Sequence, residues 1–402
     1  MKRIGMPIAG VVAVLGLAAC GSGQSTGSND GDDTKAKAGD PITLGFAIGE
    51  TGFMGPYDLP ARAAAQMAVN DVNAKGGVKG RKFRIVSENM KSKPELSGNA
   101  ATAVLGKGAD VVVTACDFDQ GSPAAIVAQG ADKLAFSTCA ASTSFGPAGI
   151  GPLAFTMATA APVEGAAMAE WAYQRKLTTA YLLLDNTIDF TKQSAAGFKA
   201  RFAKIGGDLV GSDTFKQGDQ SLAAQITKIK QLPKPPAAIY LASYMPTQAS
   251  AIKQLRAAGL DMPILGDEDL DGNYWKDAVP NVGNVFFATY ASIYGDDPDP
   301  AVNKLVDRYV AAEGKRPDTA AFLTGYAMVQ ALTKAIEGTD GSTDGKALGA
   351  ELETFREQPF VLPTTFTDKW HISFARTLRI QQIEKGKTSF LAEANPKDVP
   401  AP

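Results

Sequence analysis

Short apolar stretches alternate with amphipathic ones along most of this 402-residue chain, and that alternation constrains the fold more than any other feature. The stretch at 42–48, ITLGFAI, is short, apolar and bounded, as a buried strand is. The stretch at 61–75 instead places apolar residues on one helical face and polar residues on the other, and Gly76-Gly77 follows as a helix end. The first two elements are therefore a strand and an amphipathic helix.

The same two patterns repeat along the chain and restart after a break near 152–159. Repeated strand–helix units imply right-handed crossovers and a parallel sheet with helices on both faces. We predict strands at 42–48, 83–87, 110–115, 133–138, 180–185, 209–215, 237–243, 263–266 and 285–290. We predict helices at 61–75, 95–106, 123–130, 163–175, 191–205, 220–231, 247–258, 301–313, 320–337 and 346–356. The alternating tail at 371–387 predicts a β-ribbon.

Length and charge narrow the possible functions. The chain beyond residue 40 is longer than one hydrophobic core usually covers, so we expect two α/β lobes. Ligands of doubly wound sheets bind at the carboxyl ends of the strands, so two facing lobes would form a binding cleft. The formal net charge is only −2 and no basic stripe is present, which argues against a nucleic-acid partner.

The N-terminus has the pattern of an export signal. Lys2 and Arg3 precede an apolar run at 8–17 that is too short to span a membrane as a helix. Small residues then lead to Cys20 in Leu-Ala-Ala-Cys-Gly, which resembles the lipobox of bacterial lipoproteins. That resemblance implies an acylated Cys20 as the new N-terminus. An ordinary signal peptide with a chance cysteine is the alternative.

We therefore predict a signal peptide at 1–19 and a lipid-anchored flexible linker at 20–40, where Gly, Ser, Asp and Thr dominate. The protein would hang from the extracytoplasmic face of a cell membrane. No later stretch contains 18 uninterrupted apolar residues, so we expect no other membrane span.

Two cysteines remain in the body, Cys116 and Cys139, and each ends an apolar run. If those runs are neighbouring parallel strands, their ends lie side by side and a disulfide is feasible outside the cytoplasm. Two buried, unpaired thiols are the alternative, because geometry decides whether a bond forms.

Two longer motifs resemble a known family. The segment AAAQMAVNDVNAKGGVKGRKFRIV follows the first strand and the loop GETGFMGPYD. The second motif is SYMPTQASAIKQLRAAGLDMPILGDEDLDGN at 243–273. Both are similar to motifs of the type I periplasmic substrate-binding proteins of ABC importers, in particular the branched-chain amino-acid-binding (leucine/isoleucine/valine-binding) group. The resemblance extends over residues 40–387.

This resemblance implies two doubly wound parallel-sheet lobes joined by a three-strand hinge. The N-terminal lobe would comprise 41–156 with 291–363, and the C-terminal lobe 157–290 with 364–395. The lobes would close on a small solute, and the closed form would dock on the permease subunits of an ABC importer. We expect a monomer that uses no cofactor or metal and is not an enzyme.

The resemblance also assigns ligand contacts in the second lobe and the first loop. An amino-acid ammonium group needs a carboxylate, which the family supplies after a short strand, here at Glu268. Tyr57 and Tyr244 stand where the family places aromatic residues over the ligand. Phe190 stands where the family often has a tyrosine, so it would line the pocket without a hydroxyl.

The family's carboxylate-binding residues are replaced in this chain. The loop after the third strand carries Phe118 and Asp119 where the family usually has a serine pair. The loop after the fourth strand, STCAAS, offers Cys139 and Ser142, with Ala141 in place of the family's threonine. A ligand carboxylate beside Asp119 would be repelled. The ligand is thus an amino acid or amino-acid-like compound, or alternatively an amide, a polyol, an aromatic compound or a cation.

Other functional motifs in the sequence are incomplete. The sequence DEDLDG at 267–272 begins like a calcium loop, but its twelfth position is Ala278. His371, the single histidine, lies in the alternating tail, where a surface strand residue is expected. A ligand-sensing lipoprotein of the same fold remains an alternative function. An acid–base enzyme using Asp119 or Glu268 is a further one, although binding would occupy the same groups.

Overall fold

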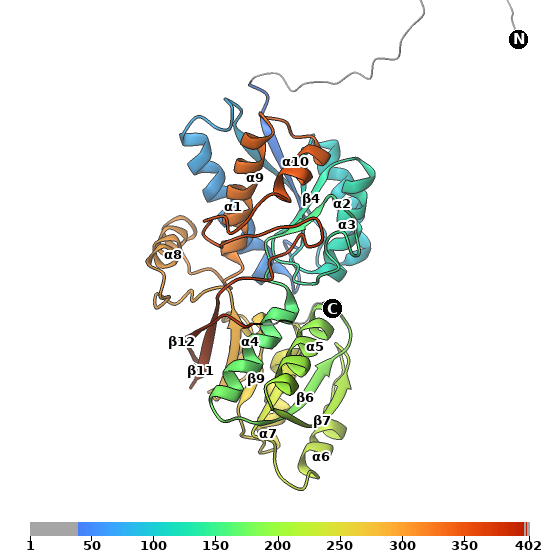
Figure 1. Ribbon diagram of the computed structural model, residues 1–402, viewed down its shortest axis with the longest axis vertical. Coiled ribbons are helices and arrows are strands. Elements are labelled where there is room, and N and C mark those ends of the chain that lie inside the picture. The colour runs from blue at the N-terminus through green and yellow to red at the C-terminus, as the bar shows by residue number, and fades with distance from the viewer. Residues whose placement is uncertain (1–38, 398, 400–402) are drawn as a thin grey trace, which may run out of the picture. The chain divides into compact units, whose positions relative to one another are not determined.

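The computed structural model describes residues 39–397 and residue 399, and these form two α/β lobes, each built on its own sheet (Figure 1). The predicted signal peptide, Cys20 and most of the predicted linker lie outside the described residues. In the described part, no helix has the length and apolarity needed to cross a membrane.

The first lobe is built on a five-stranded parallel sheet in the order β2-β1-β3-β4-β5. Its strands are β1 (Ile42–Ile48), β2 (Phe83–Asn89), β3 (Val111–Thr114), β4 (Leu134–Ser137) and β5 (Ala154–Thr156). Every residue of the apolar strand β1 is buried, as expected of a strand covered by helices on both faces.

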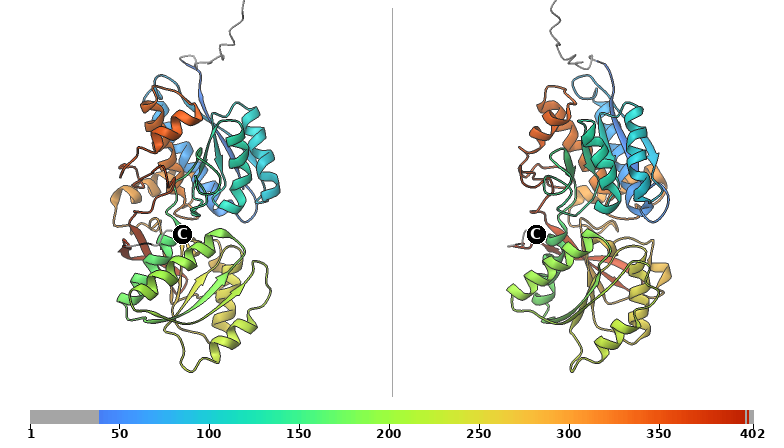
Figure 2. Two further views of the ribbon diagram at one scale, coloured as in Figure 1. Left: turned by 45° about the vertical axis from the view of Figure 1, so that its right-hand side comes forward. Right: turned by 90° about the vertical axis from the view of Figure 1, so that its right-hand side faces the viewer.

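Helices cover both faces of this sheet (Figure 2). Helix α1 packs on α9, and α10 lies beside them, whereas α2 packs on α3 over the opposite face. Helix α8 also contacts α1. The bounds are α1 (Gly55–Ala74), α2 (Pro94–Gly106), α3 (Phe118–Gly130), α8 (Pro300–Glu313), α9 (Phe322–Gly338) and α10 (Gly345–Leu352).

The second lobe is built on a seven-stranded sheet in the order β12-β11-β10-β9-β8-β6-β7. Strands β6 to β10 are parallel, and the hairpin of β11 and β12 adds two antiparallel strands at one edge. The strands are β6 (Thr179–Asp185), β7 (Asp208–Phe215), β8 (Ala238–Ala242), β9 (Ile264–Gly266), β10 (Val285–Thr289), β11 (Leu378–Glu384) and β12 (Lys387–Ala394).

Two helices of the second lobe approach each other closely because glycines face the contact. Helices α4 (Ala161–Gln174) and α5 (Asp189–Lys204) meet where a Cβ on Gly165 would lie 2.0 Å from Ser194 O. The remaining helices of this lobe are α6 (Ala223–Lys230), α7 (Thr247–Ala257) and the short 3₁₀ turns η1 (Glu268–Leu270) and η2 (Lys276–Ala278).

Three segments link the lobes, near residues 157–160, 290–293 and 363–377. Buried Arg376 of the third segment joins it to the first, because its guanidinium donates to Met157 O at 2.8 Å and also to Pro363 O at 3.2 Å within its own segment. Gln381 donates to Ala291 O at 2.8 Å beside them. We propose lobe limits at 41–156 with 291–363 and at 157–290 with 364–395, as the sequence suggests.

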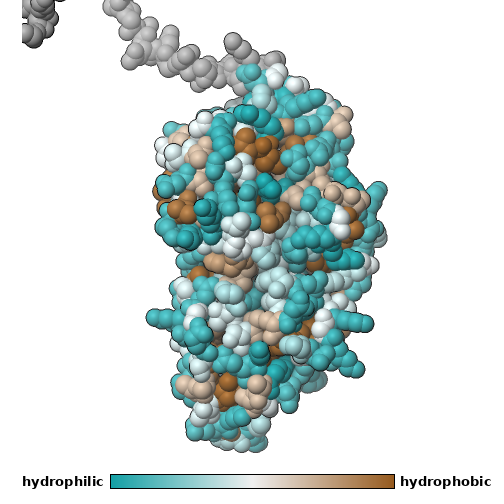
Figure 3. All heavy atoms as spheres, turned by 180° about the vertical axis from the view of Figure 1, so that it is seen from behind, coloured by the Kyte–Doolittle hydropathy of each residue, from teal (hydrophilic) through white to brown (hydrophobic). Residues whose placement is uncertain are grey.

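The face of the described chain that Figure 3 shows is mostly hydrophilic. Hydrophobic residues form small, separate groups on this face. Among the described large hydrophobic side chains, those exposed are Ile126 at 59% and Val310 at 36%. The apolar residues of the described chain are thus used mainly for packing the two lobes.

Some predicted elements differ from the observed ones. The break near 152–159 contains β5, whose three residues are too few to show a periodic pattern. Helix α1 begins six residues before the predicted start at 61, so Pro60 lies inside it. Pro60 lacks the N–H that would bond to Pro56 O, and Thr319 Oγ1 donates to that carbonyl at 3.2 Å instead.

The tail also differs from its prediction. The β-ribbon does not span 371–387 but consists of β11 and β12, while 371–377 runs between the lobes. His371 is not a surface strand residue, because its ring is buried and stacks on Phe155 with 3.7 Å between ring centroids. Its ring nitrogens lie 2.9 Å from Ala154 O and 3.0 Å from Glu353 Oε1.

Candidate functional site

A small, partly open cavity lies between the carboxyl ends of the two sheets. Its volume of about 10 Å³ is close to the space that one water molecule needs. The first lobe contributes Tyr57, Cys116, Asp117, Cys139 and Ala141 to its lining, and the second contributes Phe190, Tyr244, Glu268 and Asp269. A ligand of amino-acid size therefore requires the lobes or the lining side chains to move apart.

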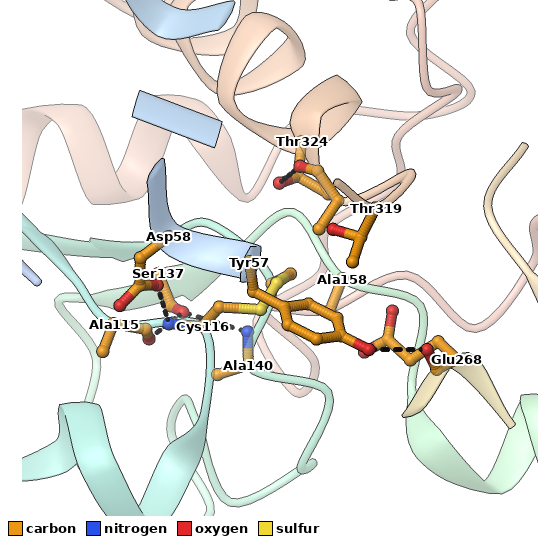
Figure 4. The surroundings of a disulfide bond; sticks show 12 residues. Tyr57, Asp58, Ala115, Cys116, Ser137, Ala140, Ala158, Glu268, Thr319 and Thr324 are labelled. Atoms are coloured by element: carbon orange, nitrogen blue, oxygen red, sulfur yellow. Dashed lines mark hydrogen bonds between the residues drawn. A yellow bond between two sulfur atoms is a disulfide. The ribbon is translucent and has the colours of Figure 1, made fainter. Parts of the chain in front are cut away.

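The start of α1 brings Tyr57 to the cavity. The Tyr57 side chain is 4% exposed, and its hydroxyl donates to the main-chain oxygen of Glu268 at 2.8 Å, which links the two lobes (Figure 4). The next residue, Asp58, points the other way and accepts from Gly49 N at 2.7 Å and Cys116 N at 2.8 Å. Burial raises the pKa of Asp58 to about 7.

The ends of β3 and β4 are joined at the cavity wall. Cys116 and Cys139 form a disulfide with 4.4 Å between their Cα atoms (Figure 4). Their strands are parallel neighbours, so both cysteines follow their strands at the same edge of the sheet. The sequence leaves open whether these cysteines form a disulfide or stay as two unpaired thiols, and the geometry favours the disulfide.

Asp117 lies in the lining, although it is not among the ligand residues predicted from the sequence. It caps helix α3, because its Oδ1 accepts from Gln120 N at 2.9 Å. Burial, followed by repulsion from Asp119, raises the pKa of Asp117 to about 8. An aspartate directly before a helix with glutamine three residues later is a capping pattern, and that signal could have identified Asp117.

Three of the predicted ligand residues, Phe118, Asp119 and Ser142, are not in the lining. Successive residues of a helix point about 100° apart, so the residues after the cap Asp117 turn away from the cavity. Asp119 instead accepts from Asp189 N at 2.9 Å, at the start of α5. Ser142 Oγ donates to the Asp189 carboxylate.

These contacts belong to a hydrogen-bonded network between the lobes, which we call the interlobe latch. Its residues are Asp119, Ser142, Thr143, Ser144, Asp189 and Gln193. Ser144 Oγ and Gln193 Nε2 donate to Asp189 Oδ2 at 3.1 and 2.7 Å, and Thr143 N donates to Gln193 Oε1 at 2.9 Å. The latch holds the lobes together beside the cavity.

The second lobe brings two acidic side chains to the cavity from the turn η1, directly after β9. Glu268 is 6% exposed and Asp269 is 2% exposed. Among the described residues, Glu268 Oε2 and both side-chain oxygens of Asp269 make no hydrogen bond of good distance and angle. Burial raises the pKa of Glu268 to about 8 and that of Asp269 well above its usual value. The Tyr290 hydroxyl still lies close enough to Glu268, and Met245 N close enough to Asp269, to lower the carboxyl pKa in part.

The turn itself is held in place by other acidic side chains of the DEDLDG segment. Ser194 Oγ donates to Asp267 Oδ2 at 2.6 Å, and Ala320 N donates to Asp271 Oδ2 at 2.6 Å. These carboxylates bind groups of the chain. They fix the position from which Glu268 and Asp269 reach the cavity.

Aromatic side chains complete the lining. Phe190 and Tyr244 lie with ring centroids 6.3 Å apart, and the Tyr244 hydroxyl donates to Met54 Sδ of the first lobe at 3.0 Å. Five of the eight predicted ligand residues thus meet at one cavity, namely Tyr57, Cys139, Phe190, Tyr244 and Glu268. The described lining contains three carboxylates and no Lys, Arg or His. This arrangement is suited to binding hydrogen-bond donors, and cations in particular.

Comparison with known proteins places the chain among solute-binding proteins. The family model described as "Periplasmic binding protein" matches residues 41–388. The Leu/Ile/Val-binding protein BraC3 of Rhizobium johnstonii is 24% identical over 321 residues, which cover 79% of this chain and 85% of that protein. The leucine-, isoleucine-, valine-, threonine- and alanine-binding protein of Pseudomonas aeruginosa is 23% identical over 327 residues, covering 81% and 85%.

Two solved structures show the breadth of ligands on this fold. The substrate-binding protein LivJ of Streptococcus pneumoniae, in complex with isoleucine, aligns with a TM-score of 0.75 at 22% identity, covering 88% of this chain and 99% of that one. A solute-binding protein of Rhodopseudomonas palustris, in complex with 3,4-dihydroxybenzoic acid, aligns with a TM-score of 0.74 at 19% identity, covering 90% and 99%. The fold therefore does not by itself identify the ligand.

Proposed function

Because the chain belongs to the periplasmic binding protein family, we propose that it captures a small amine-bearing solute, an amino acid or a similar compound, for an ABC importer. It acts outside the cytoplasm as a monomer and delivers the solute to the permease subunits. It works by binding and is not an enzyme. The observation that carries the proposal is the cavity between the lobes, where Glu268 and Asp269 present buried carboxylate oxygens that make no well-formed hydrogen bond with the described residues.

The burial of Glu268 and Asp269, and the lack of well-formed hydrogen bonds to three of their oxygens among the described residues, support an ammonium ligand. A buried carboxylate without a hydrogen-bond partner is costly, and a charge-assisted hydrogen bond from an ammonium group offsets that cost. Tyr57 reaches the main chain of Glu268 across the cavity at 2.8 Å, so this contact must lengthen or break when a solute enters. The three linking segments provide the hinge for that opening.

A thermal-shift panel tests the proposal. The full-length protein is melted with aliphatic and aromatic amino acids, amides, polyamines, sugars and aromatic acids. A bound compound at 100 times its dissociation constant raises the free energy of unfolding by about 2.7 kcal/mol. We expect an amine-bearing compound to give this shift and to be recovered chemically unchanged. A compound that is converted by the protein would refute a purely binding role.

The variant Glu268→Ala identifies the site. We expect it to abolish the shift for any amine-bearing compound that binds the wild type. Glu313→Ala is the matched control, because Glu313 is exposed at the end of α8 and outside the lining. Equal affinities of both variants would remove Glu268 from the site.

Membrane attachment through Cys20 is a separate part of the proposal. Its support is the lipobox-like sequence Leu-Ala-Ala-Cys-Gly, followed by a stretch rich in small and polar residues. Two acyl chains or more anchor a protein stably, so Cys20→Ser should release the protein from membranes into the soluble fraction. A Cys20→Ser protein that stays with the membranes would reject the lipid anchor.

A further inference from the structure

The first-lobe wall of the cavity carries an acidic side chain, Asp117, where a zwitterion would need a binding site for its carboxylate. Backbone N–H groups at the start of a helix bind anions. At the start of α3, however, the chain's own Asp117 caps the helix through Gln120 N at 2.9 Å. Asp58 likewise accepts from Cys116 N at 2.8 Å. Chain carboxylates thus already occupy these donors.

The opposite wall is acidic as well. Glu268 and Asp269 both line the cavity and are almost fully buried, with exposed fractions of 6% and 2%. One oxygen of Glu268 and both of Asp269 make no well-formed hydrogen bond with the described residues. These oxygens belong to residues that line the cavity, and as carboxylate acceptors they would be satisfied by a hydrogen-bond donor and not by a ligand carboxylate.

The described lining contains no cationic side chain to pair with these carboxyl groups. Buried Arg376 attracts Glu268 electrostatically and partly offsets the rise in its pKa that burial causes, but its guanidinium donates to Met157 O and Pro363 O of the linking segments and does not line the cavity. The neutral part of the lining is largely aromatic, with Tyr57, Phe190 and Tyr244. Aromatic faces attract cations and also cover methylene groups.

We propose that the site binds a short α,ω-diamine rather than a zwitterionic amino acid. One ammonium group binds Asp117 of the first lobe, and the other binds Glu268 and Asp269 of the second. The methylene chain lies against the aromatic rings. This inference rests on the proposed function, since it names the ligand class of the same site. A dication bridging both walls would also draw the lobes together.

Isothermal titration of the full-length protein with putrescine, leucine and acetamide tests this inference. We expect putrescine to bind most tightly. Tighter binding of leucine or acetamide would overturn the diamine assignment and leave the solute-binding function standing. If none of the panel used for the thermal-shift test binds, both the assignment and the proposed function are overturned.

The variant Asp117→Asn separates the charge of Asp117 from its capping role, because the asparagine oxygen can still accept from Gln120 N. We expect its putrescine affinity to fall at least about thirtyfold, which corresponds to about 2 kcal/mol. Asp344→Asn is the matched control. Asp344 caps α10 in the same way, through Ala347 N at 2.9 Å, and lies outside the lining.

The control is expected to bind putrescine as the wild type does. Equal putrescine affinities of the two variants would overturn the role of Asp117. A circular-dichroism melt of each variant shows whether it is folded. If Asp117→Asn does not fold, Glu268→Gln replaces it in the titration, with the same expected loss and the same refuting outcome.

Discussion

Removal of the Cys116–Cys139 disulfide is expected to lower the free energy of unfolding by about 3 kcal/mol. The bond joins cysteines separated by 23 residues in the sequence. A crosslink around a loop of this length removes about 11 cal/mol/K of entropy from the unfolded chain, equivalent to about 3.4 kcal/mol at 25 °C. The effect acts on the unfolded state, so it does not depend on any change in the native contacts.

Urea unfolding followed by circular dichroism measures the loss. Three samples are compared: the oxidised wild type, the wild type unfolded and refolded in reductant, and the double variant Cys116→Ala with Cys139→Ala. The reduced wild type keeps both sulfur atoms and so isolates the crosslink from the packing. A loss below about 1 kcal/mol in the reduced wild type would refute the unfolded-chain argument.

Three further predictions concern charge, packing and closure. Burial raises the pKa of Asp117 and Glu268 to about 8, so the folded protein binds protons that the unfolded chain has released above about pH 4.5. As the pH rises from 5.5 to 8, the free energy of unfolding of the unliganded protein should therefore fall by about 1.4 kcal/mol per pH unit for each titrating group. A melting temperature that stays constant or rises over this pH range would contradict this. Gly165→Ala should lower the free energy of unfolding by about 1–3 kcal/mol, because its Cβ would lie 2.0 Å from Ser194 O. The control Gly106→Ala should not lower it, because no atom lies within 4 Å of the added Cβ. Equal urea midpoints of the two variants would exclude the close contact of α4 and α5. Asp189→Asn should weaken the interlobe latch by about 1 kcal/mol of hydrogen bonding and so speed ligand dissociation about fivefold in stopped-flow measurements. An unchanged dissociation rate would show that the interlobe latch does not hold the closed form.

Much of the architecture could be predicted from the sequence alone. Strand β1 coincides with the apolar run at 42–48, and the helices follow the 3.6-residue pattern of apolar residues. These patterns are local, because a segment covered on two faces must be apolar throughout and one covered on a single face must be amphipathic. Where the local signal was weak, as in the three residues of β5, the prediction failed.

The candidate site could be predicted only in part. Glu268 and Tyr57 are ligand residues that the family resemblance implies, and both line the cavity. Asp117 was missed in favour of its neighbour Asp119, although both carboxylates belong to the same short loop. Sequence position identified the loop but not the side chain that faces the cavity.

The amino-acid sequence by itself determined the order of strands and helices, and therefore the edges of the two sheets at which a ligand can bind. Only the tertiary structure decided which carboxylates face the cavity and which form the latch. A turn of about 100° per helical residue separates Asp117 in the lining from Asp119 at the start of α5. The partner of Asp119 is Asp189 of the other lobe, and a contact between residues so distant in sequence leaves no local pattern.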